Sequence, residues 1–257
     1  MAETESLPDE PSIKSSHRLS GTWGSLRRRA AYVVDRINLH PGIVLQRLSS
    51  FNSISPPEME RLKSVTERQE SRNRPASLQK VVEGTHFTQK EVQSFYRSFK
   101  QTAPSGHVDQ LTFRHVFEQL FPQGNAETYA DFVFETFDLD HNGSINFEEF
   151  VRALSTLSRG TLDEKLDWIY RLYDTKDIGY ISWERLYALI SSIDEIIGRG
   201  ALPTITRKER VAYTNEIFQK LDLDKDGVIS RDEFLVACKQ DETICESIAA
   251  LNTVLVV

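Results

Sequence analysis

The sequence is short of several features that whole classes of protein need. Its two cysteines, Cys238 and Cys245, are too few for a disulfide framework and favour a reducing, cytoplasmic setting. No uninterrupted apolar run exceeds five residues, which is too short to cross a bilayer, and the first residues lack the pattern of a secretory signal. Nucleophile-elbow, phosphate-loop and HExxH motifs are also absent, and the six histidines show no metal-ligand spacing. An enzyme is therefore not expected.

Basic side chains are outnumbered, and the imbalance lies in one part of the chain. The 257 residues carry 31 basic and 38 acidic side chains, a formal net charge of −7. Residues 1–86 hold 13 basic and 10 acidic side chains, whereas residues 87–257 hold 18 basic and 28 acidic ones. An acidic body is not expected to contact nucleic acid directly and suits cations or basic segments of other proteins.

Residues 1–86 are predicted to be a variable basic leader and linker. Residues 1–22 are rich in Ser, Glu and Pro, a composition typical of disorder. Apolar side chains at helical spacing, with Arg27, Arg28 and Arg29 among them, predict an amphipathic helix at 23–38. Two readings of this helix stay open: a solvated leader, or an interfacial helix on an anionic membrane. Residues 49–84 are polar and predict a linker with at most one weak helix.

Residues 87–257 contain a fourfold internal repeat. An amphipathic helix, a polar loop and a second amphipathic helix recur near 88–121, 125–157, 162–193 and 210–240. Each loop has a glycine followed two residues later by Val or Ile: Gly106 and Val108, Gly143 and Ile145, Gly179 and Ile181, Gly227 and Ile229. The repeat predicts an all-α domain of four helix–loop–helix units in two pairs, with short strands between paired loops and a further C-terminal helix.

Two of the four loops carry the full ligand pattern of an EF-hand. This loop binds Ca²⁺ through side chains at positions 1, 3 and 5, a carbonyl at 7, a water held at 9 and a bidentate Glu at 12, with Gly at 6 for the turn. In the second loop these positions are Asp138, Asp140, Asn142, Ser144 (carbonyl), Asn146 and Glu149. In the fourth they are Asp222, Asp224, Asp226, Val228 (carbonyl), Ser230 and Glu233. We expect two Ca²⁺ sites; the alternative is a pair of acidic solvated turns.

The other two loops are predicted not to bind metal. The third has Lys176, Ile178 and Arg185 at positions 3, 5 and 12, so two cations and a hydrocarbon replace ligands. The first has no carboxylate at positions 1, 3, 5 and 12, which are Gln101, Ala103, Ser105 and Thr112. Each inactive loop therefore pairs with an active one.

The fourth site is expected to bind Ca²⁺ more tightly than the second. It offers four ligand carboxylates against three in the second site, and greater ligand charge favours tighter binding. A difference in the rigidity of the two loops could reverse the order.

Several segments resemble the Kv channel-interacting proteins of the neuronal calcium sensor group. These are residues 87–100 (FTQKEVQSFYRSFK), 121–138 (FPQGNAETYADFVFETFD), 159–174 (RGTLDEKLDWIYRLYD) and the fourth unit with its tail, 218–248. The resemblance implies a non-enzymatic auxiliary subunit of A-type (Shal-type) voltage-gated potassium channels. It implies a hydrophobic groove that binds the channel's cytoplasmic N-terminal segment, altered gating and surface expression, an oligomeric channel complex, and a cytoplasmic location peripheral to the plasma membrane.

The chain departs from that family in its loops. The family's second unit usually has a weaker residue at position 12 and prefers Mg²⁺, whereas Glu149 here completes a Ca²⁺ set, with Mg²⁺ as an alternative occupant. The family's third unit binds Ca²⁺, whereas here it should not. Met1-Ala2 also lacks the Gly that N-myristoylation of related sensors requires.

Other functions and other roles for apolar residues stay open at this point. A calcium sensor could instead regulate an enzyme such as a phosphatase or cyclase, or act as a calcium-dependent transcriptional repressor, although the acidic body argues against DNA contact. Aromatic side chains are expected mainly in the core, with the remainder available to a groove: Phe95, Phe99, Phe117, Phe132, Phe137 and Tyr173. A C-terminal helix carrying Ile244 and Leu251 either caps the fold or occupies the groove.

Overall fold

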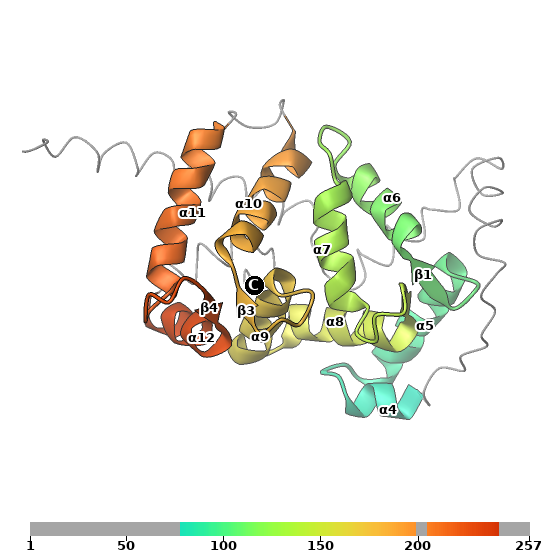
Figure 1. The fold of residues 1–257 in the computed structure, drawn as a ribbon. Helices are drawn as coiled ribbons and strands as arrows, with labels where there is room; N and C mark the ends of the chain where they lie inside the picture. Colours follow the sequence, from blue (N-terminus) through green and yellow to red (C-terminus); the bar gives the residue numbers. More distant parts are fainter. Residues whose placement is uncertain (1–77, 199–204, 242–257) are drawn as a thin grey trace, which may run out of the picture.

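The computed structural model describes residues 78–198 and 205–241, and this part of the chain is mostly helical (Figure 1). The helices are α4 (Leu78–Glu83), α5 (Gln89–Thr102), α6 (Gln110–Leu120), α7 (Glu127–Phe137), α8 (Phe147–Arg159), α9 (Leu162–Tyr173), α10 (Trp183–Ile197), α11 (Arg207–Leu221) and α12 (Arg231–Gln240). The strands are β1 (His107–Asp109), β2 (Ser144–Asn146), β3 (Tyr180–Ile181) and β4 (Ile229–Ser230). The predicted all-α class with short paired strands is confirmed. The leader helix expected at 23–38 and the C-terminal helix lie outside the described residues.

Short side-chain caps define where the helices begin. The first helix of the third unit starts with a capping box, in which Thr161 and Glu164 satisfy each other's backbone N–H groups. The second helix of each unit is capped by the residue at loop position 9: Asp109, Asn146, Ser182 and Ser230. Position 9 therefore starts the outgoing helix in all four units, and the loop's last three positions lie in the first turn of that helix.

Two antiparallel strand pairs join the loops. In the first pair Val108 lies opposite Ile145, and in the second Ile181 lies opposite Ile229. All four side chains are buried. The units consequently pair first with second and third with fourth, and each metal-binding pattern shares a strand pair with a loop that lacks it.

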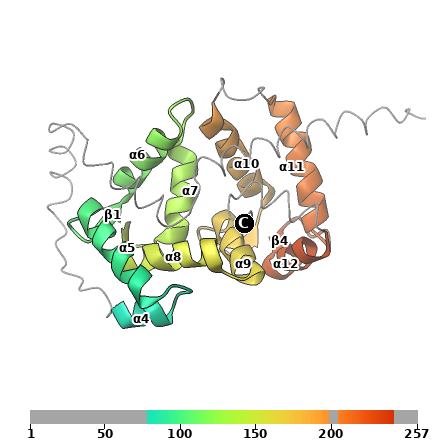
Figure 2. The same cartoon turned by 180° about the vertical axis from the view of Figure 1, so that it is seen from behind.

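One hydrophobic core runs through both pairs. Helices α6, α7, α10 and α11 lie along one side of the molecule, and α5, α8, α9 and α12 along the other (Figures 1 and 2). The two halves meet where the ring of Phe137 on α7 packs edge-on against Trp168 on α9, with centroids 6.5 Å apart. Of the six aromatic positions singled out in the sequence, five are buried and Phe95 is half-buried against the core. No helix among the described residues is both long and apolar enough to span a membrane.

The packed body starts earlier than residue 87, where the sequence pattern placed its beginning. Helix α4 lies inside the segment expected to be linker, and its Val81 is completely buried. The turn that follows is joined to α8, because the N–H of His86 donates to Ser155 Oγ at 2.7 Å. A six-residue helix with one buried side chain is too short to show a clear helical period, so the sequence allowed one weak helix in this segment but did not assign it to the packed body.

The two halves are also joined by a close backbone contact at the end of α10. The N–H of Asn125, in the connection between α6 and α7, donates to the carbonyl of Glu195 at 2.9 Å. Two glycines allow this approach: a Cβ on Gly124 would lie 2.0 Å from the carbonyl oxygen of Ile196, and one on Gly198 would lie 2.0 Å from that of Gln123. Gly198 also has φ +72°, a conformation that favours glycine.

We expect the Glu91–Arg159 ion pair to stabilise the fold down to strongly acidic pH. Arg159 donates to Glu91 Oε1 at 2.6 Å, and this bond, with those from Thr88, lowers the pKa of Glu91 to about 2. A lowered folded-state pKa contributes stability that is present above the unfolded value and lost as pH falls through the folded one. Because the pair is part-exposed, Glu91→Gln should cost about 0.5–1 kcal/mol at pH 6. Thermal unfolding should show this difference shrinking between pH 4.5 and 2.

Glu209→Gln is the matched control for this pair. Glu209 caps Thr206 through the same capping box, but no arginine among the described residues donates to it as Arg159 donates to Glu91. If Glu91→Gln lost no more stability than Glu209→Gln at every pH, this result would contradict a contribution from Arg159.

Candidate metal centres

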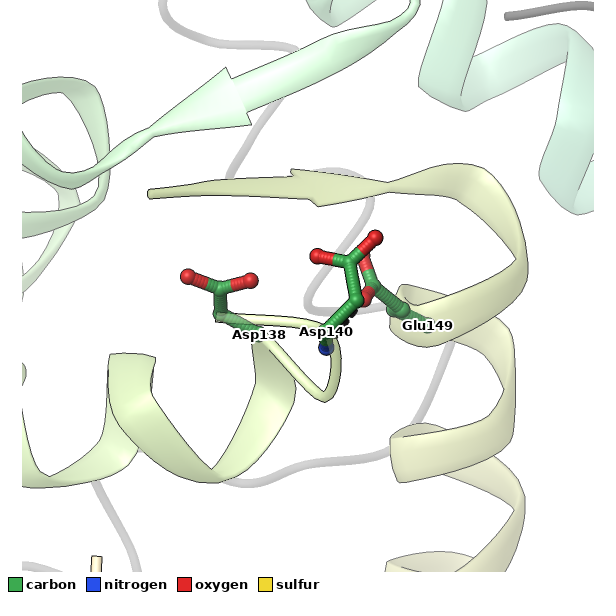
Figure 3. Close-up of side chains that lie close together, drawn as sticks. All are labelled: Asp138, Asp140 and Glu149. Carbon is green, nitrogen blue, oxygen red and sulfur yellow. Dashed lines mark hydrogen bonds between the residues drawn. The ribbon is translucent and has the colours of Figure 1, made fainter. Parts of the chain in front are cut away.

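The second loop brings three carboxylates together around one point. Asp138 ends α7, Asp140 lies in the loop and Glu149 lies on the first turn of α8 (Figure 3). One oxygen from each lies within 4.8 Å of the others, a spacing that suits a shared divalent cation.

Backbone N–H groups hold these carboxylates in place. Asp138 accepts from the N–H of Gly143 at 2.8 Å and of Asn142 at 3.1 Å, while Glu149 Oε1 accepts from Leu139 at 3.1 Å. The loop can close so tightly because Gly143 has φ +82°. Glu149 thus ties the start of α8 to the start of the loop, and the ligand oxygens are ordered by the fold itself.

Two carboxylates of the second loop are buried, so water solvates their negative charge poorly. Asp138 and Glu149 are 4% and 5% exposed. Burial raises the pKa of both groups, and the neighbouring Asp140 raises each further, against the lowering effect of the backbone hydrogen bonds. A divalent cation would offset this concentration of charge.

The fourth loop holds an acceptor that no residue in the described part of the chain satisfies. Asp222, Asp224 and Asp226 each place an oxygen within 4.8 Å of the others. Asp222 Oδ2 accepts from the N–H of Gly227 at 3.2 Å, but the buried Oδ1 has no hydrogen-bond partner within the described part of the chain. A buried carboxylate oxygen without a partner is costly, and a hard cation is the ligand that fits it.

Glu233 closes the fourth loop in the same way as Glu149 closes the second. Its Oε1 accepts from the N–H groups of Leu223 at 2.9 Å and Asp224 at 3.2 Å. Burial raises its pKa, but hydrogen bonds from the hydroxyl and N–H of Ser230 and from the loop outweigh that effect, and the net pKa is lowered. A carboxylate that stays ionised is available to a metal at neutral pH.

The remaining predicted ligands lie in the same two loops. Asn142 and Asp226, at position 5, accept from the N–H of Ser144 and Val228, each at 2.9 Å, so position 7 is held by position 5. The assignment of all ten residues as metal ligands stays a prediction. The side chains of Asn146 and Ser230 act as helix caps, a second role that their spacing to Glu149 and Glu233 indicates.

The inactive loops differ in how much of the loop shape they keep. The third has Asp174 at position 1 and φ +94° at Gly179, the same backbone turn as the active loops. In the first, α5 continues through Thr102, so Gln101 at position 1 is helical and Ala103 becomes the C-cap. Lys100 Nζ then donates to the carbonyl of Pro104 at 2.9 Å. This lysine bond was not predicted, because a basic residue before a degenerate loop has no fixed meaning in a sequence pattern.

Comparison with protein families agrees with this geometry. A family model described as an EF-hand domain pair matches residues 163–239, and one described as an EF hand domain matches residues 129–157. The matched segments contain both acidic clusters and the third loop between them. EF-hand domains imply Ca²⁺ binding.

Proposed function

We propose that this chain, an EF-hand calcium-binding protein, is a calcium-sensing regulatory subunit of an A-type voltage-gated potassium channel. The observation that supports calcium sensing most directly is the buried Oδ1 of Asp222, which lies within a cluster of three carboxylates and has no hydrogen-bond partner among residues 78–198 and 205–241. The channel partner is supported by the resemblance of residues 87–100, 121–138 and 159–174 to the channel-interacting group.

Calcium binding can be converted into movement through the position-12 glutamates. Glu233 lies on the first turn of α12, and its carboxylate contacts the N–H groups of Leu223 and Asp224 at the opposite end of the loop. A change in the position of this carboxylate therefore moves α12 relative to α11. Glu149 links α8 to the second loop in the same way. Calcium sensors of this type open apolar surface when such helices move.

The partner surface must come in part from side chains that are buried in this structure. Phe99, Phe117 and Phe137 belong to the core. An amphipathic segment of a channel would dock as a helix in a groove, replacing contacts that these side chains now make with other aromatic rings of the core, such as Phe113 and Phe150. The acidic body suits a partner segment with basic residues at its edges.

Co-purification with a channel N-terminal peptide tests the proposal. We expect the full chain to retain the peptide but not a scrambled peptide of the same composition, and we expect the affinity to differ between calcium and chelator. Failure to retain the peptide under both conditions would exclude the channel and leave regulation of an enzyme or of transcription as the alternatives. Calorimetry with Ca²⁺ alone is independent of this result and tests calcium binding separately.

The proposal also covers the leader, which lies outside the described residues, and the location and assembly of the protein. The basic leader at 23–38 would contact anionic lipid next to the channel, giving a cytoplasmic location peripheral to the plasma membrane. Assembly as an oligomer would follow from the multiple subunits of a channel. Direct contact with nucleic acid is not part of the proposal.

A further inference from the structure

The third loop is closed in this structure although it lacks a set of metal ligands. Asp174 accepts from the N–H groups of Ile178 at 2.8 Å and Gly179 at 2.7 Å, the two bonds that Asp138 makes in the second loop. Asp177 at position 4 has φ +51°, as His141 does with +53° in the second loop. Lys176 and Ile178 occupy ligand positions, so an interaction within the protein has to supply the support that a metal would add to these bonds.

Arg185, at position 12, makes that interaction as a hydrogen-bond donor, whereas the glutamates at this position are acceptors. The glutamates at position 12 of the active loops accept hydrogen bonds from N–H groups at the start of the loop. Arg185 instead donates, through Nε to the carbonyl of Tyr173 at 3.2 Å and through Nη2 to the hydroxyl of Thr175. The first turn of α10 is therefore tied to the start of its loop, as in the active units, by a covalently attached cation.

The same side chain reaches the other half of the protein. The guanidinium carbon of Arg185 lies 5.3 Å from the ring centroid of Phe132 on α7, within the range of a cation–π contact. At the far end of α10, the carbonyl of Glu195 accepts from Asn125. Both ends of α10 are thus joined to the second unit, which places α7 and α10 side by side (Figures 1 and 2).

We propose that Arg185 is the built-in cation of the third loop, which keeps the third unit closed without metal and fixed to α7. The guanidinium carries its positive charge as part of the chain, so this closure does not depend on calcium. Calcium bound at the fourth loop then moves α12 against a fixed α9–α10 unit. The inference rests on calcium binding at the fourth loop and not on the channel partner.

Hydrogen exchange of the full chain, in calcium and in chelator, tests the proposal. The amides of Ile178 and Gly179 should exchange at rates within about twofold of each other in the two conditions, whereas Gly227 should slow at least about tenfold in calcium. In Arg185→Gln, the amides of Ile178 and Gly179 should exchange about tenfold faster in chelator. Arg185→Lys should recover only part of this protection, because lysine lacks the fork of donors.

Lys176→Gln is the matched control, since it removes the other cation of the loop from an exposed position. It should leave the exchange of Ile178 and Gly179 unchanged. The proposal is overturned if these amides in the unmodified chain depend on calcium as strongly as Gly227, or if neither Arg185 variant accelerates them. If the exchange rate of the Gly227 amide were the same in calcium and in chelator, calcium binding at the fourth loop would be refuted. The comparison of Arg185 variants in chelator would still decide the role of Arg185.

Discussion

Replacing Glu233 with Gln is expected to abolish the tighter of two calcium-binding phases in calorimetry, weakening the fourth site by at least about 100-fold. The substitution removes one of the four carboxylates predicted to bind the ion and leaves a single carbonyl oxygen in place of a bidentate group. It also weakens the acceptor for the N–H groups of Leu223 and Asp224, which order the loop. The buried Oδ1 of Asp222, which has no hydrogen-bond partner among the described residues, then loses the bound cation as its partner.

Two variants make this result specific. Asp232→Asn removes the neighbouring charge at position 11, which is exposed, and should change the affinity less than about threefold. Glu149→Gln should abolish the weaker phase and leave the tighter one. If Glu149→Gln removed the tighter phase instead, the order of the sites would be reversed, and the rigidity of the second loop would outweigh the additional charge of the fourth.

The repeat and its loops were readable from the sequence because each position in an EF-hand loop has one chemical task. Asp138 and Glu149 are 11 positions apart in the chain, yet the turn at Gly143 brings them within 4.8 Å. The strand pairs followed from the apolar residue two places after each glycine, as with Ile145. Local geometry of this kind is encoded in spacing, and spacing is visible without a structure.

Contacts between segments far apart in the chain were not readable in that way. Arg185 was predicted only to exclude a metal, because its position over Phe132 depends on how α7 and α10 pack. Its bonds to Tyr173 and Thr175 lie within the third unit, but the metal-ligand pattern assigns no role to a donor at position 12. The helical continuation of α5 past Gln101 was missed for a related reason: without ligand carboxylates, nothing in the pattern marks where the loop begins. In the first and third loops, the side chains at the ligand positions predicted that no metal binds. They did not predict which other contacts these loops make.

Replacing Gly124 with Ala is expected to destabilise the protein by about 3 kcal/mol, the largest effect we predict for a site outside the metal centres. The added Cβ would meet the carbonyl oxygen of Ile196 at 2.0 Å and that of Glu195 at 2.6 Å. Both atoms belong to backbone at the end of α10, so neither can turn away as a side chain could. The hydrogen bond from Asn125 to Glu195 must lengthen to relieve the clash. Urea unfolding of the full chain measures the loss.

Gly84→Ala is the appropriate control, because the atoms nearest to its added Cβ belong to the guanidinium of Arg152, at 3.1 Å and beyond, and a long side chain can move. Its cost should stay below about 1 kcal/mol. The strain in Gly124→Ala falls on the contact between the end of α10 and the α6–α7 connection. The fourth loop follows the C-terminal end of α11 and is not part of this contact. Unfolding free energy should therefore fall while the calcium affinity of the fourth site is retained. A Gly124→Ala protein as stable as Gly84→Ala would contradict this prediction, because it would mean that the α6–α7 connection and the end of α10 can separate without cost.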